Sequence, residues 1–292
     1  MLDPTFTVLG GRGFIGSHLV RHLRNQGHEV WVPQRDDPAV FERELGHAVY
    51  AIGLTADFRR RPLATVEAHV SVLRRVLEAG HFESLTYLSS TRVYAGAAST
   101  SEAAALRVDP NAPDDLYNLS KLLGEALCLH CGHAGMKVAR LANIVGARPA
   151  GEEGSGAANF IDALIDEGRR TCHVRLQTSL ASTKDYLGID AAVDLLVRIA
   201  LSAHTGIFNV ASGCSVSNAE IKRLIERETG WSVAVEPDAP TWGFAPIDMS
   251  RVTRLFAPSA DALARSFTTS FTALLRAAAA APSPSHLEGT PA

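Results

Sequence analysis

Short apolar runs rich in β-branched and aromatic residues alternate with longer stretches of helical period in the first half of the chain. Four of these runs lie at residues 5–9, 29–33, 48–52 and 84–88. Such alternation predicts successive strand–helix–strand units and a parallel sheet. The apolar side chains between the first two runs share one helical face, and they are Ile15, Leu19, Val20 and Leu23. Gly27 follows, where a C-terminal glycine is expected.

The second half of the chain carries further helical and strand patterns. Helices are expected at residues 113–129, 159–168, 189–203 and 218–229, and strands at 138–141 and 207–210. Between residues 146 and 182 the pattern weakens, and Gly and Glu cluster at 151–156. This predicts a mobile segment that faces the ligand.

Charge and cysteine content limit the classes of partner. With 28 basic and 31 acidic residues the net charge is −3, so no overall field attracts nucleic acid or an anionic membrane. The apolar stretches end well short of the roughly 20 residues that a membrane helix needs. Four cysteines are too few for a disulfide scaffold and fit a reducing compartment. We expect a cytoplasmic protein with a small-molecule partner, no nucleic acid, no membrane and no metal.

A glycine-rich turn follows the first predicted strand and opens the first helix. The glycines are Gly10, Gly13 and Gly16, with Phe14 and Ile15 between them. Glycine allows a tight turn and a close approach of the backbone to a diphosphate, which the helix N-terminus then attracts. This context predicts a dinucleotide site. Gly53, after the third apolar run, is also expected to contact the cofactor.

The end of the second strand bears on which dinucleotide binds. An NAD site usually places a carboxylate there, about 20 residues after the glycines, to hold the ribose 2′-hydroxyl. Gln34 and Arg35 occupy this place instead, and Arg12 lies inside the glycine turn. Arginines can neutralise a 2′-phosphate, which favours NADP. The alternative is NAD, with Asp36 as the carboxylate and the arginines as solvated surface charges.

Tyr117 and Lys121 are four residues apart on a predicted helix and therefore share one face. Positive charge near a phenol favours its ionised form, so the pair suits proton transfer. Ser90 lies at the end of the 84–88 strand, the end at which ligands bind in parallel sheets. Its hydroxyl can hydrogen-bond a substrate oxygen while Tyr117 moves the proton. We expect Ser90, Tyr117 and Lys121 to be catalytic.

These features predict an α/β fold with a doubly wound parallel sheet of the Rossmann type and a small C-terminal substrate domain. We expect the dinucleotide-binding domain at residues 1–144 with 188–211. The substrate domain is expected at 145–187 and 212–276. Residues 277–292, rich in Ala, Pro and Ser, are expected to form a disordered tail.

The sequence resembles the extended short-chain dehydrogenase/reductase family, in its NAD-dependent epimerase/dehydratase branch that acts mainly on nucleotide sugars. The resemblance spans residues 5 to about 258. It rests on the glycine turn, Leu88–Tyr94, Tyr117 with Lys121, and the segments at 140–146, 184–190, 206–213 and 248–251. It implies that Tyr117 is the acid/base, that Lys121 is its partner and also binds the cofactor ribose, and that Ser90 is the catalytic serine.

The resemblance also implies substrate contacts, and these are Ser90, Thr91, Asn143, Asn159 and Lys184. Many family members carry a Thr-Asp-Glu triplet whose acids perform dehydration, where this chain has Ser90-Thr91-Arg92. This departure argues against a 4,6-dehydratase. Lys184 stands in place of the usual Arg, and His69 in place of a usual Asn.

The expected function is an NADP-dependent nucleotide-sugar ketoreductase. The alternative is a nucleotide-sugar 4-epimerase with tightly bound NAD. A further alternative is a non-catalytic protein that senses NADP, since resemblance does not prove turnover. The family also implies a homodimer formed through the helix that bears Tyr117.

Overall fold

The structure, a computed structural model, describes residues 5–55, 57–148 and 159–281. The first half contains β1 (Phe6–Leu9), α1 (Phe14–Asn25), β2 (Val30–Trp31), η1 (Pro38–Phe41), β3 (His47–Tyr50), α2 (Pro62–Val66), η2 (Glu67–Ser71), α3 (Val72–Ala79), β4 (Ser84–Ser90), η3 (Thr91–Tyr94), α4 (Asp115–His130) and β5 (Met136–Leu141). The second half contains β6 (Asn143–Val145), α5 (Phe160–Thr171), β7 (His173–Leu176), β8 (Thr183–Gly188), α6 (Ile189–Leu201), β9 (Gly206–Val210), β10 (Ser215–Ser217), α7 (Asn218–Thr229), β11 (Ser232–Val235), α8 (Ser250–Phe256) and α9 (Ala260–Ala280).

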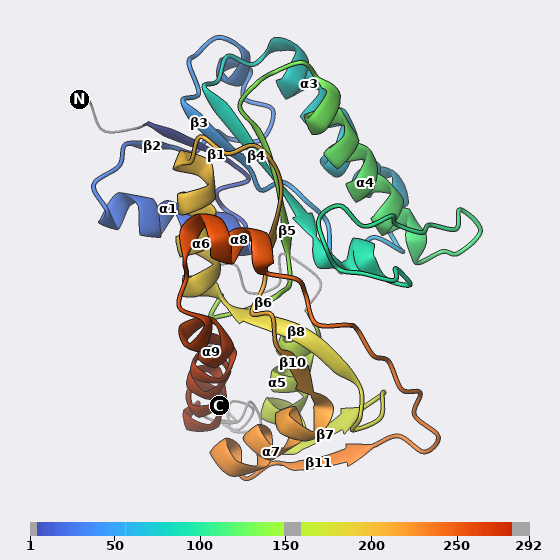
Figure 1. Ribbon diagram of the computed structural model, residues 1–292. Coiled ribbons are helices and arrows are strands. Elements are labelled where there is room, and N and C mark those ends of the chain that lie inside the picture. Colours follow the sequence, from blue (N-terminus) through green and yellow to red (C-terminus); the bar gives the residue numbers. More distant parts are fainter. Residues whose placement is uncertain (1–4, 56, 149–158, 282–292) are drawn as a thin grey trace, which may run out of the picture.

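Six parallel strands form the main sheet in the order β2-β1-β3-β4-β5-β9 (Figure 1). The chain runs outward from β1 to β2 and then crosses to β3 on the other side of β1. The direction of winding therefore reverses between β1 and β3. In open parallel sheets, ligands bind beside such a reversal, at the carboxyl ends of the strands. The predicted doubly wound sheet is confirmed.

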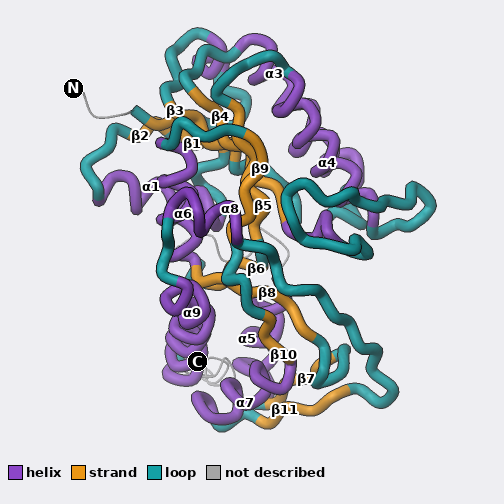
Figure 2. Tube along the Cα trace, viewed as in Figure 1, coloured by secondary structure: helices purple, strands orange, loops and turns teal. Residues whose placement is uncertain are grey.

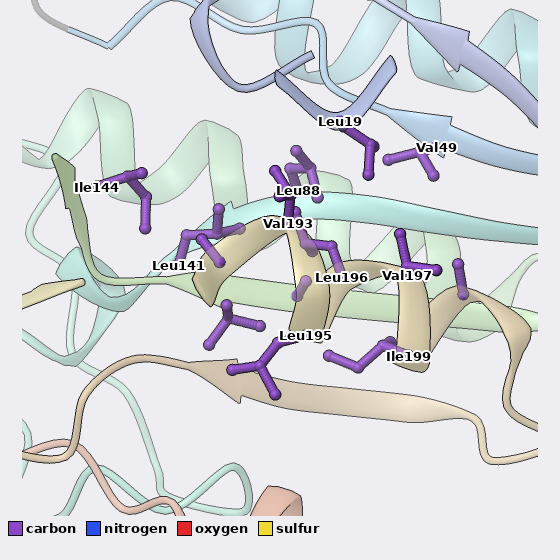
Figure 3. Close-up of a cluster of buried hydrophobic side chains, with 14 of the residues drawn as sticks. Leu19, Val49, Leu88, Leu141, Ile144, Val193, Leu195, Leu196, Val197 and Ile199 are labelled. Carbon is purple, nitrogen blue, oxygen red and sulfur yellow. The ribbon is translucent and has the colours of Figure 1, made fainter. Parts of the chain in front are cut away.

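Helices cover both faces of this sheet (Figures 1 and 2). On one face α1 and α6 pack against each other and the strands, and on the other face α3 and α4 do so. Figure 3 shows α6 inserting Val193, Leu196 and Val197 among side chains of the sheet and of α1. Each such buried side chain contributes about 1.5–3 kcal/mol to stability. None of the helices in the described ranges is long and apolar enough to span a membrane.

The apolar stripe predicted for the first helix lies on α1. Leu19, Val20 and Leu23 are buried against the sheet, and Ile15 packs beside them. The helix ends at Asn25, and Gly27 has a φ of +88°, in the left-handed region that glycine adopts at little cost. The predicted helix stop is confirmed.

A smaller domain lies below the main sheet in Figure 1. It contains a three-stranded sheet in the order β10-β8-β6 and a parallel pair of β7 and β11. Helices α5, α7 and α9 enclose a second core that includes Trp231, Phe267 and Phe271. Helix α9 packs along β8 and α7 and also contacts α6, so it joins the two domains.

Two expectations for the second half differ from the structure. Helix α9 continues to Ala280, four residues into the segment expected to be a disordered tail, because alanine has the highest helix propensity and Ala278 is buried. Residues 282–292 lie outside the described residues. The segment expected to be mobile contains α5 and β7, which pack on α9 and β11, while its Gly and Glu cluster at 151–156 lies outside the described residues.

Candidate active site

The turn between β1 and α1 leaves no room for side chains at two of its glycines. Gly10 has a φ of +82°, and a Cβ there would lie 2.8 Å from the carbonyl carbon of Ala51. A Cβ on Gly16 would collide with the carbonyl oxygen of Gly10. The turn is therefore held against the end of β3, and α1 is held against the turn. A dinucleotide fits this cradle because its diphosphate can approach bare backbone.

Helix α1 begins directly after Gly13 with no side-chain cap. The first N–H groups of a helix lack acceptors within the helix and carry partial positive charge. They can therefore bind a diphosphate, through Phe14, Ile15 and Gly16. The beginning of α1 thus has the chemistry that the glycine pattern predicted.

The residues expected to select the cofactor are near this turn. Val32, directly after β2, would be 2.8 Å from a Cβ on Gly11. Gln34 and Arg35 follow it and are exposed, as is Arg12 in the turn. Ribose specificity stays a prediction.

Ser90 and Tyr117 meet at the carboxyl end of the main sheet. Ser90 is the last residue of β4, and its Oγ accepts a hydrogen bond of 3.2 Å from the Arg92 N–H. Tyr117 lies in the first turn of α4, where Ser90 and Thr55 are near enough to its hydroxyl to favour its ionised form. The sheet and α4 thus bring the predicted serine and tyrosine together.

The Tyr117 side chain is 4% exposed. Burial raises the pKa of its hydroxyl above the ordinary value, and the side chains of Ser90 and Thr55 and the charge of Arg92 oppose this rise. The neutral phenol is therefore the form that burial favours. A neutral phenol can donate a proton to a substrate oxygen.

Lys121 lies one helical turn further along α4. Its Nζ donates a hydrogen bond of 2.8 Å to the carbonyl oxygen of Leu88 and would be 3.5 Å from a Cβ on Gly53. Burial lowers the pKa of Lys121 to about 7, and the charge of Glu125 opposes this. The predicted electrostatic partner of Tyr117 is thus near its own titration point at neutral pH, and Arg92 is the cation that lowers the pKa of Tyr117.

His69 connects the loop after β3 to helix α4. Its Nε2 accepts a hydrogen bond of 3.2 Å from the Leu54 N–H, and its Nδ1 lies 2.8 Å from Ser120 Oγ, which donates to the carbonyl of Tyr117. Burial lowers the pKa of His69 to about 2, so the ring is neutral. The proton must be on Nδ1, because Nε2 accepts. His69 therefore fixes the loop beside Gly53 against α4.

A buried ion pair connects the strands and the helix that carry Ser90 and Tyr117. Arg140 and Glu125 are each 3% exposed in their side chains and are 2.6 Å apart. Glu125 also accepts a hydrogen bond of 2.5 Å from Ser89 Oγ, and Arg140 donates to Tyr94 Oη at 2.9 Å. This network connects β4, α4 and β5 and places a carboxylate near Lys121.

The remaining predicted substrate residues lie on several elements. Thr91 is buried at the start of η3, and Asn143 donates a hydrogen bond of 2.8 Å to the Asp185 carbonyl. Asn159 caps α5 by accepting the Asp162 N–H at 3.0 Å, which gives it a structural role. Lys184 lies in β8 with its Nζ 4.9 Å from the Phe160 ring centre.

Two residues that contact Tyr117 were not predicted. Thr55 lies beyond the end of β3, and Arg92 is two residues after Ser90, with its guanidinium 5.7 Å from the Tyr117 ring centre. Their positions after strand ends are the one signal that could have identified them, because ligands collect at that edge. A contact between distant segments leaves no local pattern in the sequence.

Solved structures share this fold at low identity. MoeE5 in complex with UDP-glucuronic acid and NAD has a TM-score of 0.73 at 19% identity, over 94% of this chain and 99% of the other. RMD from Pseudomonas aeruginosa complexed with NADPH has a TM-score of 0.71 at 17% identity, over 94% and 99%. UDP-glucose 4-epimerase from Bifidobacterium longum, with NAD+ and UDP, has 0.70 at 18% identity, over 93% and 97%.

Among proteins of curated function, none matches this sequence significantly. The model of the NAD dependent epimerase/dehydratase family matches residues 6–211. That range includes the glycine turn, Ser90, Tyr117 and Lys121 and covers most of the chain. The resemblance seen in the sequence motifs is thereby confirmed, and the chain belongs to the NAD dependent epimerase/dehydratase family.

Proposed function

We propose that this protein is an NADP-dependent ketoreductase of nucleotide sugars. The observation that carries the proposal is the position of the buried Tyr117 beside Ser90, at the sheet edge where the glycine turn opens. Structural neighbours were solved with UDP sugars and with NAD or NADPH, which supports the substrate and cofactor classes.

The residues have distinct tasks in this reaction. When bound, the reduced nicotinamide supplies a hydride to the keto carbon, and the carbonyl oxygen then needs a proton. Ser90 orients that oxygen through a hydrogen bond. Tyr117 donates its phenolic proton to the oxygen, so the C=O double bond becomes a C–O single bond that bears a new O–H. Lys121 binds the cofactor ribose, and the charges of Arg92 and Lys121 stabilise the phenolate that remains.

The 4-epimerase is the second candidate, because the same three residues suffice for it. Tyr117 would first accept the proton of the sugar hydroxyl and later return it, with the hydride taken and given back on the other face. A neighbouring fold, the Bifidobacterium longum enzyme, is an epimerase that holds NAD+. The epimerase leaves the cofactor unchanged overall, whereas the ketoreductase consumes it.

Titration of the protein with NADPH and NADH, followed by incubation with 4-keto and 4-hydroxy nucleotide sugars, tests the proposal. We expect tighter NADPH binding and one equivalent of NADPH oxidised per keto sugar reduced. Interconverted sugars with no net oxidation would instead indicate the epimerase. Binding of cofactor with no turnover across a broad panel would support the NADP-sensing alternative.

A variant pair tests the cofactor assignment. Arg35→Ala removes the guanidinium expected at the 2′-phosphate and should weaken NADPH binding about 10-fold, the scale of a lost charge-assisted hydrogen bond, without changing NADH binding. Arg24→Ala, on the exposed end of α1, is the control and should change neither. Equal binding of NADPH by Arg35→Ala and the parent protein would contradict the assignment.

A further inference from the structure

Arg92 lies where it can contact a substrate as well as influence the charge of Tyr117. It lies in η3, directly after the end of β4, with its guanidinium 5.7 Å from the Tyr117 ring centre and 5.1 Å from the Phe58 ring centre. Cation–π contacts with two rings and a 3.4 Å hydrogen bond to the Asp114 carbonyl hold the side chain in place. The guanidinium is therefore preorganised beside the residue that transfers the proton.

Positive charge exceeds negative charge around this position. Asp114 is 3.5 Å from Arg92, but the same carboxylate binds Arg59 more closely, with hydrogen bonds of 2.5 and 2.7 Å. Lys184 lies in β8 with its Nζ 4.9 Å from the Phe160 ring centre, and the charge of Arg92 adds to burial in lowering the pKa of Lys184. One shared carboxylate thus serves two arginines, with a third cation close by.

The ion pair between Arg92 and Asp114 is weak enough for an anionic ligand to compete with it. Their side chains are 35% and 50% exposed, and ion pairs this exposed contribute about 0–1 kcal/mol. A planar carboxylate that binds the guanidinium through two hydrogen bonds in a desolvated site contributes more. An anion on the substrate can therefore compete with Asp114 or join it.

The position of Arg92 also limits which anion could reach it. In a nucleotide sugar the diphosphate is attached at C1, across the ring from C4. A group beside Tyr117 is near the reacting carbon and hence far from the diphosphate. The ring neighbours of a reacting C4 are C3, which bears a hydroxyl, and C5, which bears the exocyclic carbon. Of these two substituents the exocyclic carbon is the one that is a carboxylate in sugar acids.

We propose that Arg92, assisted by Lys184, binds a carboxylate on the sugar ring of the substrate, and that the preferred substrates are nucleotide-linked sugar acids. The inference rests on the proposed function, since it takes the reacting carbon to lie at Tyr117. Arg92 would then determine substrate specificity. It occupies the position at which many family members carry an acid that performs dehydration.

Binding measurements test this separately from turnover. UDP-glucuronic acid and UDP-glucose differ only in whether the exocyclic carbon is a carboxylate or an alcohol, and each can be titrated calorimetrically into the protein loaded with oxidised cofactor. We expect UDP-glucuronic acid to bind roughly 10-fold to 100-fold more tightly, the range expected of a charge-assisted, bidentate contact. Arg92→Met, which keeps the length of the side chain without charge, should remove this preference.

A matched control is Arg59→Met, because Arg59 contacts the same Phe58 ring, at 4.8 Å, and the same Asp114. We expect Arg59→Met to keep the preference for the acid, and Arg92→Lys to keep part of it. Thermal unfolding and cofactor titration of each variant verify that fold and dinucleotide site are intact.

Each other outcome overturns the proposal. Equal binding of the two sugars by the parent protein, or no binding of either, would show that a ring carboxylate is not recognised. An equal loss of affinity for both sugars in Arg92→Met would assign Arg92 to the diphosphate instead. Reduction of neutral keto sugars without any preference for acids would leave the proposed function standing while refuting this inference.

Discussion

Tyr117 and Lys121 are both buried, and burial favours the neutral form of each. A neutral phenol is the proton donor that reduction of a ketone needs. A neutral or half-protonated lysine gives up positive charge that binding of the cofactor could restore, because ribose hydroxyls replace lost hydration. Near neutral pH the resting protein thus holds Tyr117 as the neutral phenol, while Lys121 is close to its pKa of about 7.

The role of Tyr117 predicts the effect of removing one oxygen. Tyr117→Phe should reduce kcat by about 100-fold or more, because general acid catalysis contributes roughly 10²–10⁴-fold. Cofactor affinity should change little. Tyr186→Phe is the control, since Tyr186 is equally buried but lies in β8 against Phe267. Steady-state kinetics with cofactor titrations provide the measurement, and near-normal turnover in Tyr117→Phe would refute the mechanism.

Lys121 predicts a pH dependence of stability. Its pKa is about 7 in the folded protein against an ordinary 10.5, so between these values the unfolded chain binds a proton that the folded protein lacks. The free energy of unfolding therefore rises with pH there, by at most about 1.4 kcal/mol per unit, and the burial penalty is fully felt below pH 7. Lys121→Met lacks this contribution.

Urea unfolding of the cofactor-free proteins at pH 6 to 9 measures the effect. The free energy of unfolding of the parent protein, minus that of Lys121→Met, should increase as pH rises above 7. Parallel pH profiles for the two proteins would mean that Lys121 retains its ordinary pKa when folded.

At the scale of single residues, the sequence indicated Tyr117 and Ser90 but not the other residues that surround Tyr117. Ser90 and Tyr117 lie together at the end of β4, and Lys121 follows one turn along α4, because a strand end and a helix face are local patterns. Their catalytic roles stay predictions. Thr55 and Arg92 reach Tyr117 only through the tertiary fold. Asn159 was expected at the substrate, and its Oδ1 is used as a helix cap, a role that Asn commonly fills.

At the scale of elements, the Glu125–Arg140 pair fixes α4 to β5. Arg140→Met leaves the Glu125 charge buried without its partner and should lower the free energy of unfolding by about 3–5 kcal/mol. Adding Glu125→Gln should recover part of this loss, because Gln is uncharged and still accepts from Ser89. Chemical unfolding of the single and double variants measures it, and additive losses would exclude coupling across the pair.

Helices were easier to predict than the sheets of the small domain. Helix α7 has the predicted bounds, because Ser217 caps its start and Gly230, with a φ of +73°, ends it. Strand β7 pairs with β11, more than 50 residues away in sequence. The sequence of neither strand indicates which strand it pairs with. The register of such a pair depends on packing against α5 and α7, which a single sequence does not specify.

On the scale of the whole molecule, one face of α4 exposes apolar side chains that a second copy of the chain could cover. Leu123 and Leu129 of α4 are 51% and 40% exposed, and Ala126 between them is also exposed. We expect this face to form a homodimer, as the family resemblance implies. Leu123→Asp should convert a dimer of the parent protein to monomers in light scattering, because a desolvated charge opposes association. The exposed Leu63 provides a control, and Leu63→Asp should leave the dimer intact.

Helix α9 contacts both β8 of the small sheet and α6 beside the main sheet, and the division into two domains stays a prediction. The hydrophobic pattern of α9 shows that one face is buried. It does not show which elements cover that face. Placing an element between domains depends on which surfaces remain uncovered after the rest of the chain has folded.

One residue, Ala142, separates β5 of the main sheet from β6 of the small sheet, and the chain re-enters α6 directly after Gly188. The described residues of the intervening segment, 143–148 and 159–187, contribute no strand to the six-stranded sheet, whose strands lie within residues 6–141 and 206–210. Recombination between relatives at Ala142 and Gly188 would therefore exchange Lys184 and its surroundings while inheriting every strand of the main sheet from one parent. If the proposed function holds, such an exchange changes the residues around the substrate and keeps Ser90, Tyr117 and the glycine turn of one parent.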